Sequence, residues 1–301
     1  MNKPAEPLVS VIINCYNGEE YLRNAIESIL SQNYSNLEVI FWDNQSIDNS
    51  AQIFLSYKDA RFKYYKSKKH TLLYEARDLA IKESSGKYIT FLDVDDWWDS
   101  EKIYKQVEKL QVSDAVLCYS NYVVVNERKN KKYILYKKTL PEGRITNELL
   151  ANYVVGILTI MIRRDIYLKM LKGFDKKYHL IGDFDFILRL SNVGVATVIN
   201  RPLAYYRWHG NNESIKKENL FLEEYREWIN ENEIVFKKLY PEGWGKFIDQ
   251  NNYRSCINSI KNNNMENFKK YFHEIPIFNI KKIKLIFLSL LPKSLFLKLR
   301  A

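Results

Sequence analysis

Apolar and polar positions alternate regularly over the first hundred residues. Continuous apolar runs at 8–16, 37–43 and 87–93 predict strands that are buried on both faces. A shorter run at 61–66 predicts a further strand, and apolar residues at helical spacing over 18–32 predict a helix between the first two strands. This strand–helix alternation indicates an α/β, Rossmann-like domain with an open, mostly parallel central sheet and helices on both faces.

One predicted helix of this region precedes the strand at 87–93. Its apolar positions are Leu72, Ala76, Leu79 and Ala80, and we expect these side chains to face the core. In parallel sheets of this kind, ligands bind beyond the carboxyl ends of the strands. The polar residues that follow the predicted strands are therefore the first candidates for a functional site.

The pattern changes after residue 110. Apolar segments at 115–125 and 131–137 predict two strands joined by a polar turn, a helical pattern follows from 182, and a strand returns at 195–209. From residue 213 onwards the pattern is helical. We expect one domain whose two halves span residues 1–110 and 111–212, followed by a basic helical region over 213–301.

Composition supports a globular protein and limits its class. Hydrophobic residues make up 46% of the chain, and its three cysteines (Cys15, Cys118 and Cys256) lie far apart without a CxxC pair. This spacing excludes a zinc ribbon or a disulfide framework and fits a reducing compartment. The beginning of the chain has no signal-peptide pattern, and no apolar run reaches the roughly 18 residues of a membrane-spanning helix.

Charge is distributed unevenly along the chain. The formal net charge is +10, of which residues 261–301 contribute +7. A nucleic acid, an anionic membrane surface or a solvated helical face could each account for this excess. Nucleic-acid binding is disfavoured because the charge lies beside aliphatic residues and no known binding motif is present.

The stretch FLDVDDWWDS, residues 91–100, places three aspartates directly behind a predicted buried strand. Three interpretations are open for Asp93, Asp95 and Asp96. One carboxylate can cap the following helix, the cluster can form ion pairs with Lys87 and Lys102, or it can bind a divalent cation, which prefers hard oxygen ligands. The chain has neither GxGxxG after the first strand nor GxxxxGK[ST], so a cation would be another way to neutralise a diphosphate.

Four segments together resemble the family-two inverting glycosyltransferases of the GT-A fold, as found in bacterial surface-glycan synthesis. They are VSVIINCYNGEEYLRNAIESILSQNYSNLEVIFWDNQSIDNS, EARDLAIKESSGKYITFLDVDD, GFDKKYHLIGDFDFILRL and YYRWHGNNES, in this order between residue 9 and about residue 214. The resemblance implies transfer of a sugar from a nucleotide diphosphate donor, with UDP-sugars favoured, to a hydroxyl group of a glycan or lipid-linked glycan. It also implies a nucleotide-sugar-binding half over residues 1–110 and an acceptor-binding and catalytic half of the same domain over 111–212. The last ninety residues carry no such motif.

For the donor, the resemblance implies a role for each residue that matches the family's motifs. Tyr16 would stack on the nucleotide base, although a core tyrosine at a strand end is the alternative. Asn44 stands where the family usually has a second aspartate that binds uracil, so a pyrimidine base is favoured but not fixed. Arg77 would approach the nucleotide, with a surface arginine as the alternative, and Asp93 would contact the ribose or metal-bound water.

For metal and catalysis, the resemblance implies that Asp95 and His209 hold Mn²⁺ or Mg²⁺, and that Asp96 caps the next helix. Asp183 aligns with the general base, but Gly182 replaces the glutamate that commonly precedes it. A helix-capping role is the alternative for Asp183. Asp185, two positions further on, would then be structural.

Two other classes of protein remain as alternatives. A nucleotidyltransferase on a similar sheet would normally carry a glycine-rich basic loop after the first strand, which is absent here. A nucleotide-sugar-binding protein without catalysis would be expected to lack the base or the DxD motif, and this chain has both.

The basic end of the chain suggests a membrane partner. Residues 279–300, NIKKIKLIFLSLLPKSLFLKLR, combine lysines with an apolar stretch that is too short and too interrupted to span a bilayer. They suit an interfacial helix with its lysines against anionic headgroups. An ordinary helix packed on the protein is the alternative. We therefore expect a cytoplasmic protein, peripheral on the inner face of the cell membrane.

Overall fold

The computed structural model describes residues 6–276, 279–292 and 295–296. The chain forms two compact units, of which the first comprises Met1–Thr146 and Val154–Asn212. The second comprises Asn147–Tyr153 and Glu213–Ala301. The first unit therefore joins the two halves expected over 1–110 and 111–212, except for a seven-residue segment (147–153) that belongs to the second unit.

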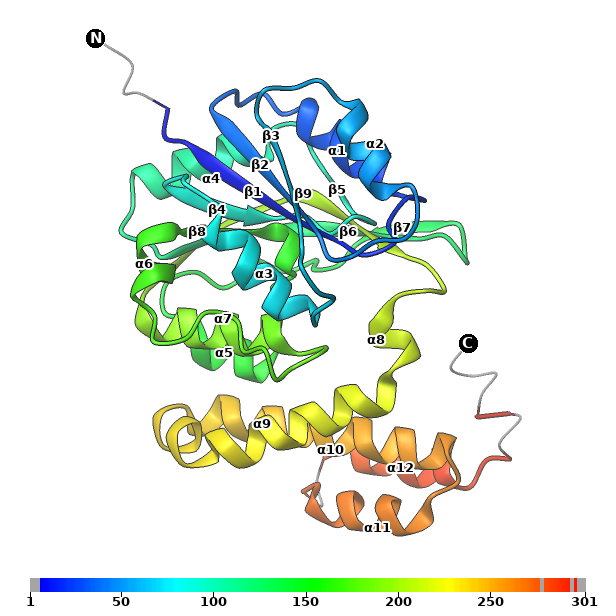
Figure 1. The fold of residues 1–301 in the computed structure, drawn as a ribbon. Coiled ribbons are helices and arrows are strands. Elements are labelled where there is room, and N and C mark those ends of the chain that lie inside the picture. Colours follow the sequence, from blue (N-terminus) through cyan, green and yellow to red (C-terminus); the bar gives the residue numbers. More distant parts are fainter. Residues whose placement is uncertain (1–5, 277–278, 293–294, 297–301) are drawn as a thin grey trace. The chain divides into compact units, whose positions relative to one another are not determined.

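The first unit is built around one mixed sheet (Figure 1). Its strands in the described part of the chain are β1 (Val9–Cys15), β2 (Leu37–Asp43), β3 (Phe62–Lys66), β4 (Tyr88–Phe91), β5 (Trp97–Trp98), β6 (Leu117–Asn126), β7 (Lys131–Ile134), β8 (Ile160–Arg163) and β9 (Ala196–Trp208). They follow the order β3-β2-β1-β4-β8-β6-β9-β5, and β7 pairs with β6 outside this path.

The sheet has a parallel half and a mixed half. Strands β3, β2, β1 and β4 are all parallel, as the apolar runs predicted. Beyond β4, β8 runs antiparallel to both of its neighbours, and β5 and β7 are also antiparallel to their partners, while β6 and β9 are parallel. The β6–β7 pair is antiparallel because a short turn connects these two strands.

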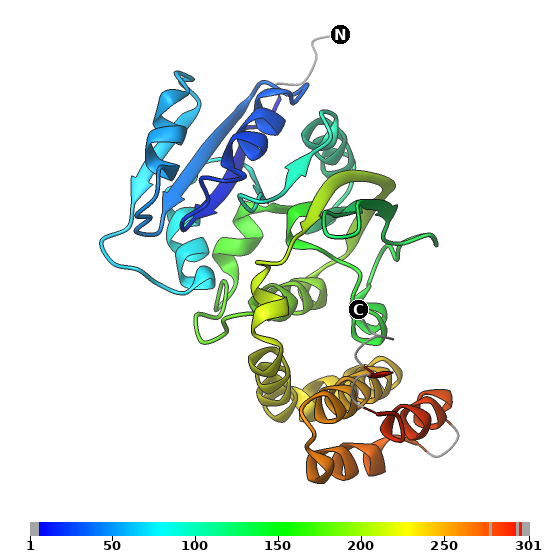
Figure 2. The same ribbon diagram turned by 90° about the vertical axis from the view of Figure 1, so that its right-hand side faces the viewer.

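Helices cover both faces of the sheet (Figures 1 and 2). Those of the first unit are α1 (Leu22–Leu30), α2 (Ser50–Ser56), α3 (Leu73–Lys82), α4 (Lys102–Gln111), α6 (Arg164–Lys169) and α7 (Gly182–Val193), with the 3₁₀ turn η1 (Ile157–Thr159) and the start of α5 (Thr146–Ala151). Helices α1 and α4 bury Leu22, Ile26, Ile103 and Val107 in one core cluster with β1 and β2. Helix α3 lies on the opposite face (Figures 1 and 2).

The buried face of α3 differs from the one predicted. Leu72 lies outside the helix and is exposed, and Leu79 is only half-buried. The helix instead buries Tyr74, Ala76, Arg77, Ala80 and Ile81. The buried face differs because Tyr74 and Arg77 point into the protein, where their polar ends find partners beside the ends of the strands.

The second unit is helical. Its helices are α8 (Glu213–Lys216), α9 (Glu218–Leu239), α10 (Pro241–Lys261), α11 (Met265–Glu274) and α12 (Ile280–Ser289), together with most of α5. Helices α10, α11 and α12 share a small apolar core that includes Cys256, Phe268, Leu285 and Leu288. The C-terminal helical region is therefore a packed body with its own core.

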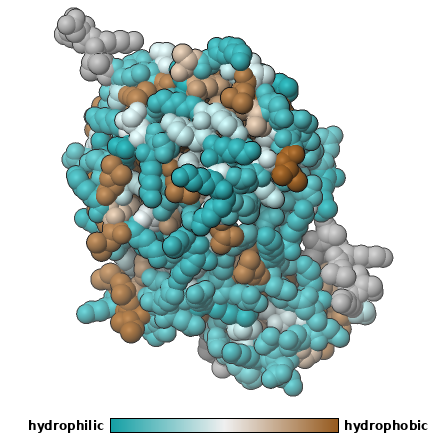
Figure 3. Space-filling view, viewed as in Figure 1, coloured by the Kyte–Doolittle hydropathy of each residue, from teal (hydrophilic) through white to brown (hydrophobic). Residues whose placement is uncertain are grey.

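The length and hydropathy of the described helices bear on membrane association. Within the described residues, none of the helices combines the length and the apolar character that a bilayer crossing requires. On the face shown in Figure 3, hydrophilic side chains dominate, and apolar side chains form small separate patches.

A buried lysine lies behind the aspartate cluster. The ammonium group of Lys102 donates to Thr90 Oγ1 and to Gln106 Oε1, both at 2.8 Å, and lies 4.1 Å from the centre of the Trp98 ring. Burial lowers the pKa of Lys102 to about 7. The expected alternative of an ion pair between Lys102 and the aspartates is therefore wrong, since its ammonium bonds to neutral side chains.

This lysine predicts a specific pH dependence of stability. Because the folded pKa is about 7 and the unfolded value is near 10, the unfolded chain binds one more proton between these limits. The free energy of unfolding should therefore rise with pH across this window, by about 1.4 kcal/mol per pH unit for one proton. Urea denaturation of wild type and Lys102→Met between pH 7 and 9.5 tests this, and the variant should lose that increase.

Lys109→Met on the same helix is the matched control because Lys109 is exposed. It should keep the wild-type pH dependence. Equal slopes for wild type and Lys102→Met would show that Lys102 is not neutral in the folded protein.

Candidate active site

Polar residues meet beyond the ends of β1 and β2. Tyr16 follows β1 and is 51% exposed, so the alternative of a core tyrosine is wrong. Its ring centre lies 4.3 Å from that of His70, at an interplanar angle of 50°. The chain turns sharply after each strand, because Asn17 and Gln45 adopt positive φ angles of 54° and 71°. An exposed ring at a sheet's carboxyl edge is available to stack on a planar base.

Asn44 lies beside this ring pair and is buried. Its side-chain amide donates to the Thr71 carbonyl at 2.8 Å, and its Oδ1 accepts from the Thr71 N–H and hydroxyl at 3.2 Å. His70 Nδ1 lies 3.0 Å from the Asn44 carbonyl oxygen. The side chain of Asn44 thus fixes the loop that carries His70, and its direct role in base recognition stays a prediction.

Arg77 and Asp93 form the centre of the site. Arg77 is 2% exposed, so the alternative of a surface arginine is wrong. Its Nη2 donates to Asp93 Oδ1 at 2.6 Å, and its guanidinium lies over the rings of Tyr74 and Phe174. The ion pair joins α3 to the end of β4.

Asp95, which follows β4, and His209, which follows β9, are brought together in the folded chain. His209 Nε2 lies 3.1 Å from Asp95 Oδ2. The backbone N–H of Asn211 donates to His209 Nδ1 at 3.1 Å, so Nε2 carries the proton of the neutral ring and donates it to Asp95. The two residues that the sequence assigned to one metal site are therefore in direct contact.

Arg207 holds the aspartate loop in place. Its Nε donates to the Asp95 carbonyl at 2.8 Å, and its backbone N–H donates to Asp96 Oδ1 at 2.9 Å. The guanidinium also pairs with Glu127 and lies 4.6 Å from the ring centres of Tyr21 and Trp97. This one side chain ties the loop to the end of β9.

Asp96 does not cap the following helix, which corrects the prediction. It is buried and accepts from the backbone of Arg207, while Asp99 Oδ1 accepts from the N–H of Glu101 just before α4. Burial raises the pKa of the Asp96 carboxyl well above its ordinary value, and the charges of Asp95 and Asp93 raise it further. The buried Asp96 carboxyl group therefore stabilises the aspartate loop from inside the protein and does not cap a helix.

Asp183 lies at the first turn of α7, against α3. Its Oδ1 accepts from the backbone N–H of Phe184 at 2.8 Å and from the Tyr74 hydroxyl at 3.3 Å. Burial raises the pKa of Asp183, the nearby charge of Arg77 lowers it, and that of Asp93 raises it. The carboxylate thus lies within the electrostatic reach of the Arg77–Asp93 pair.

Gly182 is explained by Tyr74. A Cβ atom at position 182 would lie 2.4 Å from Tyr74 Cδ2, so the tyrosine ring occupies the space of any larger side chain. The Tyr74 hydroxyl also donates to the Leu180 carbonyl at 3.0 Å. The departure from the acidic pair of the family is therefore matched by an aromatic residue on α3.

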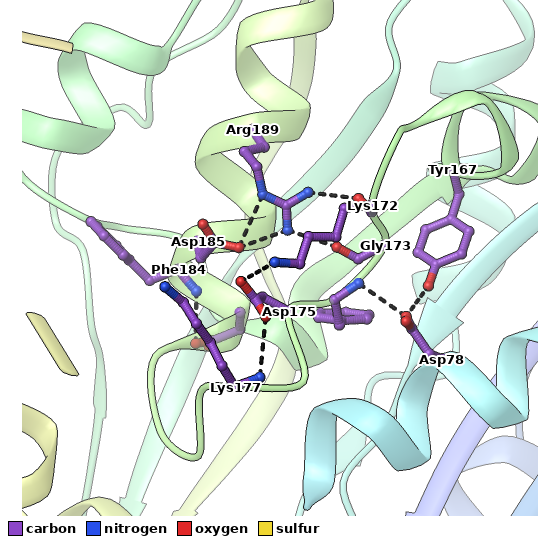
Figure 4. Close-up of polar contacts among 11 residues, drawn as sticks. Asp78, Tyr167, Lys172, Gly173, Asp175, Lys177, Phe184, Asp185 and Arg189 are labelled. Atoms are coloured by element: carbon purple, nitrogen blue, oxygen red, sulfur yellow. Dashed lines mark hydrogen bonds and ion pairs between the residues drawn. The ribbon is translucent and has the colours of Figure 1, made fainter. Parts of the chain in front are cut away.

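The loop before Asp183 is fixed by polar contacts (Figure 4). Asp78 accepts from the Tyr167 hydroxyl and from the Phe174 N–H. Arg189 pairs with Asp185 at 2.6 Å and donates to the carbonyls of residues 172 and 173 at 2.7 Å. Asp185 is thus engaged in a structural ion pair, in agreement with the sequence-based interpretation.

Four residues of the site were missed by the sequence interpretation: Tyr74, His70, Arg207 and Glu127. Tyr74 had a usable signal, since it lies three positions before Arg77 and shares its helix face. The contacts of His70 and Arg207 depend on loops that meet only in the folded chain, so no local pattern could reveal them.

The residues present fit a divalent cation with few protein ligands. In residues 6–276, 279–292 and 295–296, no group of three or more His, Cys, Asp or Glu side chains is arranged to hold a metal. Mg²⁺ is commonly bound through one or two carboxylates together with substrate phosphates and water. Asp95 meets that requirement, and His209 would bind through Nε2 only in the tautomer that carries its proton on Nδ1.

The packing of Gly182 against Tyr74 predicts a destabilising substitution. Gly182→Ala should lower the free energy of unfolding by about 1–3 kcal/mol, because an added Cβ forces the Tyr74 ring to move. Urea denaturation measures this loss. Gly245→Ala in α10 is the control, since nothing lies within 4 Å of its added Cβ and alanine favours a helix. A Gly182→Ala variant as stable as wild type would contradict the packing account.

Comparison with known proteins places this site in a family. Residues 10–171 match the model of glycosyl transferase family 2. The chain is 33% identical over 159 residues to WfgD from Escherichia coli, a UDP-Glc:alpha-D-GlcNAc-diphosphoundecaprenol beta-1,3-glucosyltransferase, and 38% identical over 117 residues to WfaP from the same organism, which carries the same description. These matches cover 53% and 39% of this chain, and 61% and 47% of the relatives.

The fold is shared with a solved structure. TarS from S. aureus (residues 1–349) superposes with a TM-score of 0.59 at 16% identity, covering 87% of this chain and 89% of that one. TarS has also been solved with UDP-GlcNAc, and that structure gives a TM-score of 0.58 over 87% and 90% of the two chains. The central sheet with its helical covering is thus a GT-A fold. The chain belongs to glycosyl transferase family 2.

Proposed function

We propose that this protein is an inverting glycosyltransferase that moves a hexosyl or N-acetylhexosaminyl group from a nucleotide diphosphate donor to a hydroxyl of a glycan or lipid-linked glycan. UDP-sugars are the favoured donors. The relatives WfgD and WfaP are named as UDP-Glc transferases acting on a diphosphoundecaprenol-linked sugar, and TarS was solved with UDP-GlcNAc. These names support a UDP-sugar and a lipid-linked acceptor for this chain.

The observation that carries the proposal is the convergence of Arg77, Asp93 and Asp183. Arg77 bonds to Asp93 at 2.6 Å, and the charges of both residues act on the Asp183 carboxyl. The residues proposed to hold the nucleotide and the residue proposed to accept a proton therefore share one site. A helix cap alone would not require Asp183 to lie in the field of this buried ion pair.

In the proposed reaction, a carboxylate oxygen of Asp183 accepts the proton of the acceptor hydroxyl. The hydroxyl oxygen forms a bond to the anomeric carbon while the bond from that carbon to the diphosphate oxygen breaks. The nucleoside diphosphate leaves with the electron pair, and attack from the opposite side inverts the configuration. A Mn²⁺ or Mg²⁺ ion on Asp95, with His209 beside it, would neutralise the charge of the diphosphate.

Removing the Asp183 carboxylate should reduce sugar transfer without destabilising the fold. Asp183→Asn should reduce transfer by roughly 10²–10⁴, the usual contribution of general-base catalysis. Its folding should not suffer at neutral pH: a carboxyl whose pKa is raised by folding loses stability as pH rises through that value, and Asn removes this cost. Transfer is measured by release of nucleoside diphosphate and stability by thermal unfolding.

The acceptor for this assay is a synthetic N-acetylglucosaminyl diphosphate lipid, chosen from the relatives' descriptions. Asp185→Asn is the comparison variant, because its carboxylate is paired with Arg189 and should matter for stability more than for the chemical step. Near-normal transfer by Asp183→Asn, under conditions in which wild type is active, would rule out Asp183 as the base.

Metal dependence gives a second prediction. UDP should raise the melting temperature much more with Mn²⁺ or Mg²⁺ than with EDTA, because ligand stabilisation grows as RT ln(1 + [L]/Kd). A tenfold loss of affinity lowers it by about 1.4 kcal/mol at saturating ligand. Asp95→Ala should abolish the metal-dependent part. Equal shifts with metal and with EDTA in wild type would refute the metal site.

We further propose that helix α12 rests on an anionic membrane surface, which would place the protein at the inner face of the cell membrane. Its packed face contributes Leu285 and Leu288 to the core of the second unit. The other side exposes apolar residues at helical spacing: Ile280, Ile283, Ile286, Phe287 and Leu290. Such an uncovered apolar stripe suits the boundary of headgroups and acyl chains.

The lysines of this helix contribute less than the sequence suggested. Lys282 donates to the Ile275 carbonyl at 2.6 Å, and Lys281 lies over the Tyr253 ring, which leaves Lys284 fully exposed. Lys293, Leu297 and Leu299 of the predicted segment lie outside the described residues. The apolar stripe is therefore the main determinant in this proposal.

Flotation with vesicles tests the stripe. The triple variant Ile283→Gln/Phe287→Gln/Leu290→Gln should lose binding to phosphatidylglycerol vesicles, since each substitution removes apolar area from the membrane contact. It should keep the wild-type melting temperature because the packed face is untouched. Val193→Gln, at an exposed apolar position of α7, is the control. Wild-type protein that does not float with these vesicles at low salt would refute the membrane role.

A further inference from the structure

A pocket outside the nucleotide-binding residues lies between β6, β9 and the segment after β7. It has a volume of about 530 Å³, and its lining includes Asn121, Tyr136, Lys137, Lys138, Asn200 and Pro202. None of the residues proposed for the donor or the metal lines it. The pocket therefore needs a separate explanation.

The pocket is formed by an irregularity in the sheet. The pairing of β6 with β9 shifts register on both sides of Asn121, so that residues around Asn200 bulge out of the ladder. Such bulges redirect side chains and are frequent beside active sites. The Asn121 amide donates to the Tyr136 carbonyl at 2.7 Å, and Asn200 Oδ1 accepts from the Leu140 N–H at 2.8 Å. These two contacts hold the wall of the pocket in place.

The wall is strongly basic. Residues 128–138 contain six lysine or arginine side chains, and no acidic residue lies between Glu127 and Glu142. Lys137 and Lys138 are exposed where they line the pocket. Across the described ranges, no ion pair joins either of them to an acidic side chain. Positive charge gathered without counter-charges favours an anionic ligand.

Three tyrosine rings lie next to one another beside the pocket. The Tyr136 ring lies 6.2 Å from that of Tyr122, which in turn lies 6.4 Å from Tyr206. Burial raises the pKa of Tyr122 well above its ordinary value, and the charges of Asp96 and Asp183 add to this. Tyr122 thus packs beside Tyr136, which lines the pocket.

We propose that this pocket binds the phosphate or diphosphate group of the acceptor, so that the acceptor is an anionic, phosphate-bearing glycan. This inference rests on the proposed function, since an acceptor must reach Asp183. A discrete anion suits a concave site that combines two lysines with side-chain amides. Asn121 is buried in the wall of the pocket, so a small anion can reach it more readily than a flat membrane surface can.

Direct binding tests the pocket without requiring turnover. The probe is hexyl diphosphate, compared with hexanol, in the presence of saturating UDP and Mg²⁺ to occupy the donor site. Isothermal titration should show binding of the diphosphate and none of the alcohol. Lys137→Ala/Lys138→Ala should weaken the affinity for the probe about tenfold or more, as expected when two charge-assisted contacts are lost.

The control is Lys269→Ala/Lys270→Ala, which removes the same charge from two exposed neighbouring lysines of α11. It should bind the probe like wild type. An unchanged affinity in the pocket variant, or probe binding that UDP abolishes in wild type, would overturn the proposal. The proposal would also be overturned if the pocket variant bound the probe like wild type but no longer floated with phosphatidylglycerol vesicles. Lys137 and Lys138 would then contact lipid in the wild-type protein.

Stabilisation by UDP is recorded for each variant in the same experiment. The pocket variant should retain it, because the pocket contains no donor-site residue. Wild-type protein that binds no UDP would refute the proposed function, whereas wild-type protein that binds UDP but not hexyl diphosphate would refute only the pocket.

Discussion

The guanidinium of Arg77 has almost no contact with water, and a charge in such a place must be balanced by a neighbour. Asp93 supplies the balance at 2.6 Å, and removing Asp93 would leave the buried guanidinium uncompensated. The ion pair joins α3 to the end of β4. Tyr74 packs against the same guanidinium and connects this contact to the start of α7 through Asp183.

Helix α7 depends on the ion pair through Tyr74. The ring of Tyr74 lies under the guanidinium on one side and fills the space above Gly182 on the other. Its hydroxyl reaches Asp183 and the Leu180 carbonyl. Tyr74 thus couples the position of α3 to that of Asp183, and Gly182 allows α3 and α7 to pack closely.

The sequence predicted β1, β2 and β4 well, because each is buried on both faces and appears as a largely apolar run. The β6–β7 hairpin and the helix from residue 182 were also predicted, and Phe186, Ile187 and Leu190 of that helix are buried. The predicted face of α3 was right at Ala76 and Ala80 but wrong at Leu72 and Leu79, because Tyr74 and Arg77 are buried through polar partners distant in sequence. Lys102 was misjudged for the same reason, since its environment is formed by β4 and α4 together.

Some site residues could be predicted from the sequence and others could not. Tyr16 and Asp95 follow the ends of β1 and β4, and Arg77 lies on a helix with a recognisable motif. Their place at one edge of the sheet could therefore be expected from the topology of a parallel sheet. The wall around Asn121 depends on a register shift between β6 and β9, which leaves no periodic trace in either strand. A sheet that is regular beside the proposed donor site and irregular beside the proposed acceptor pocket can keep the first site fixed while the second varies. This follows because a bulge changes which side chains face the ligand without disturbing the parallel strands.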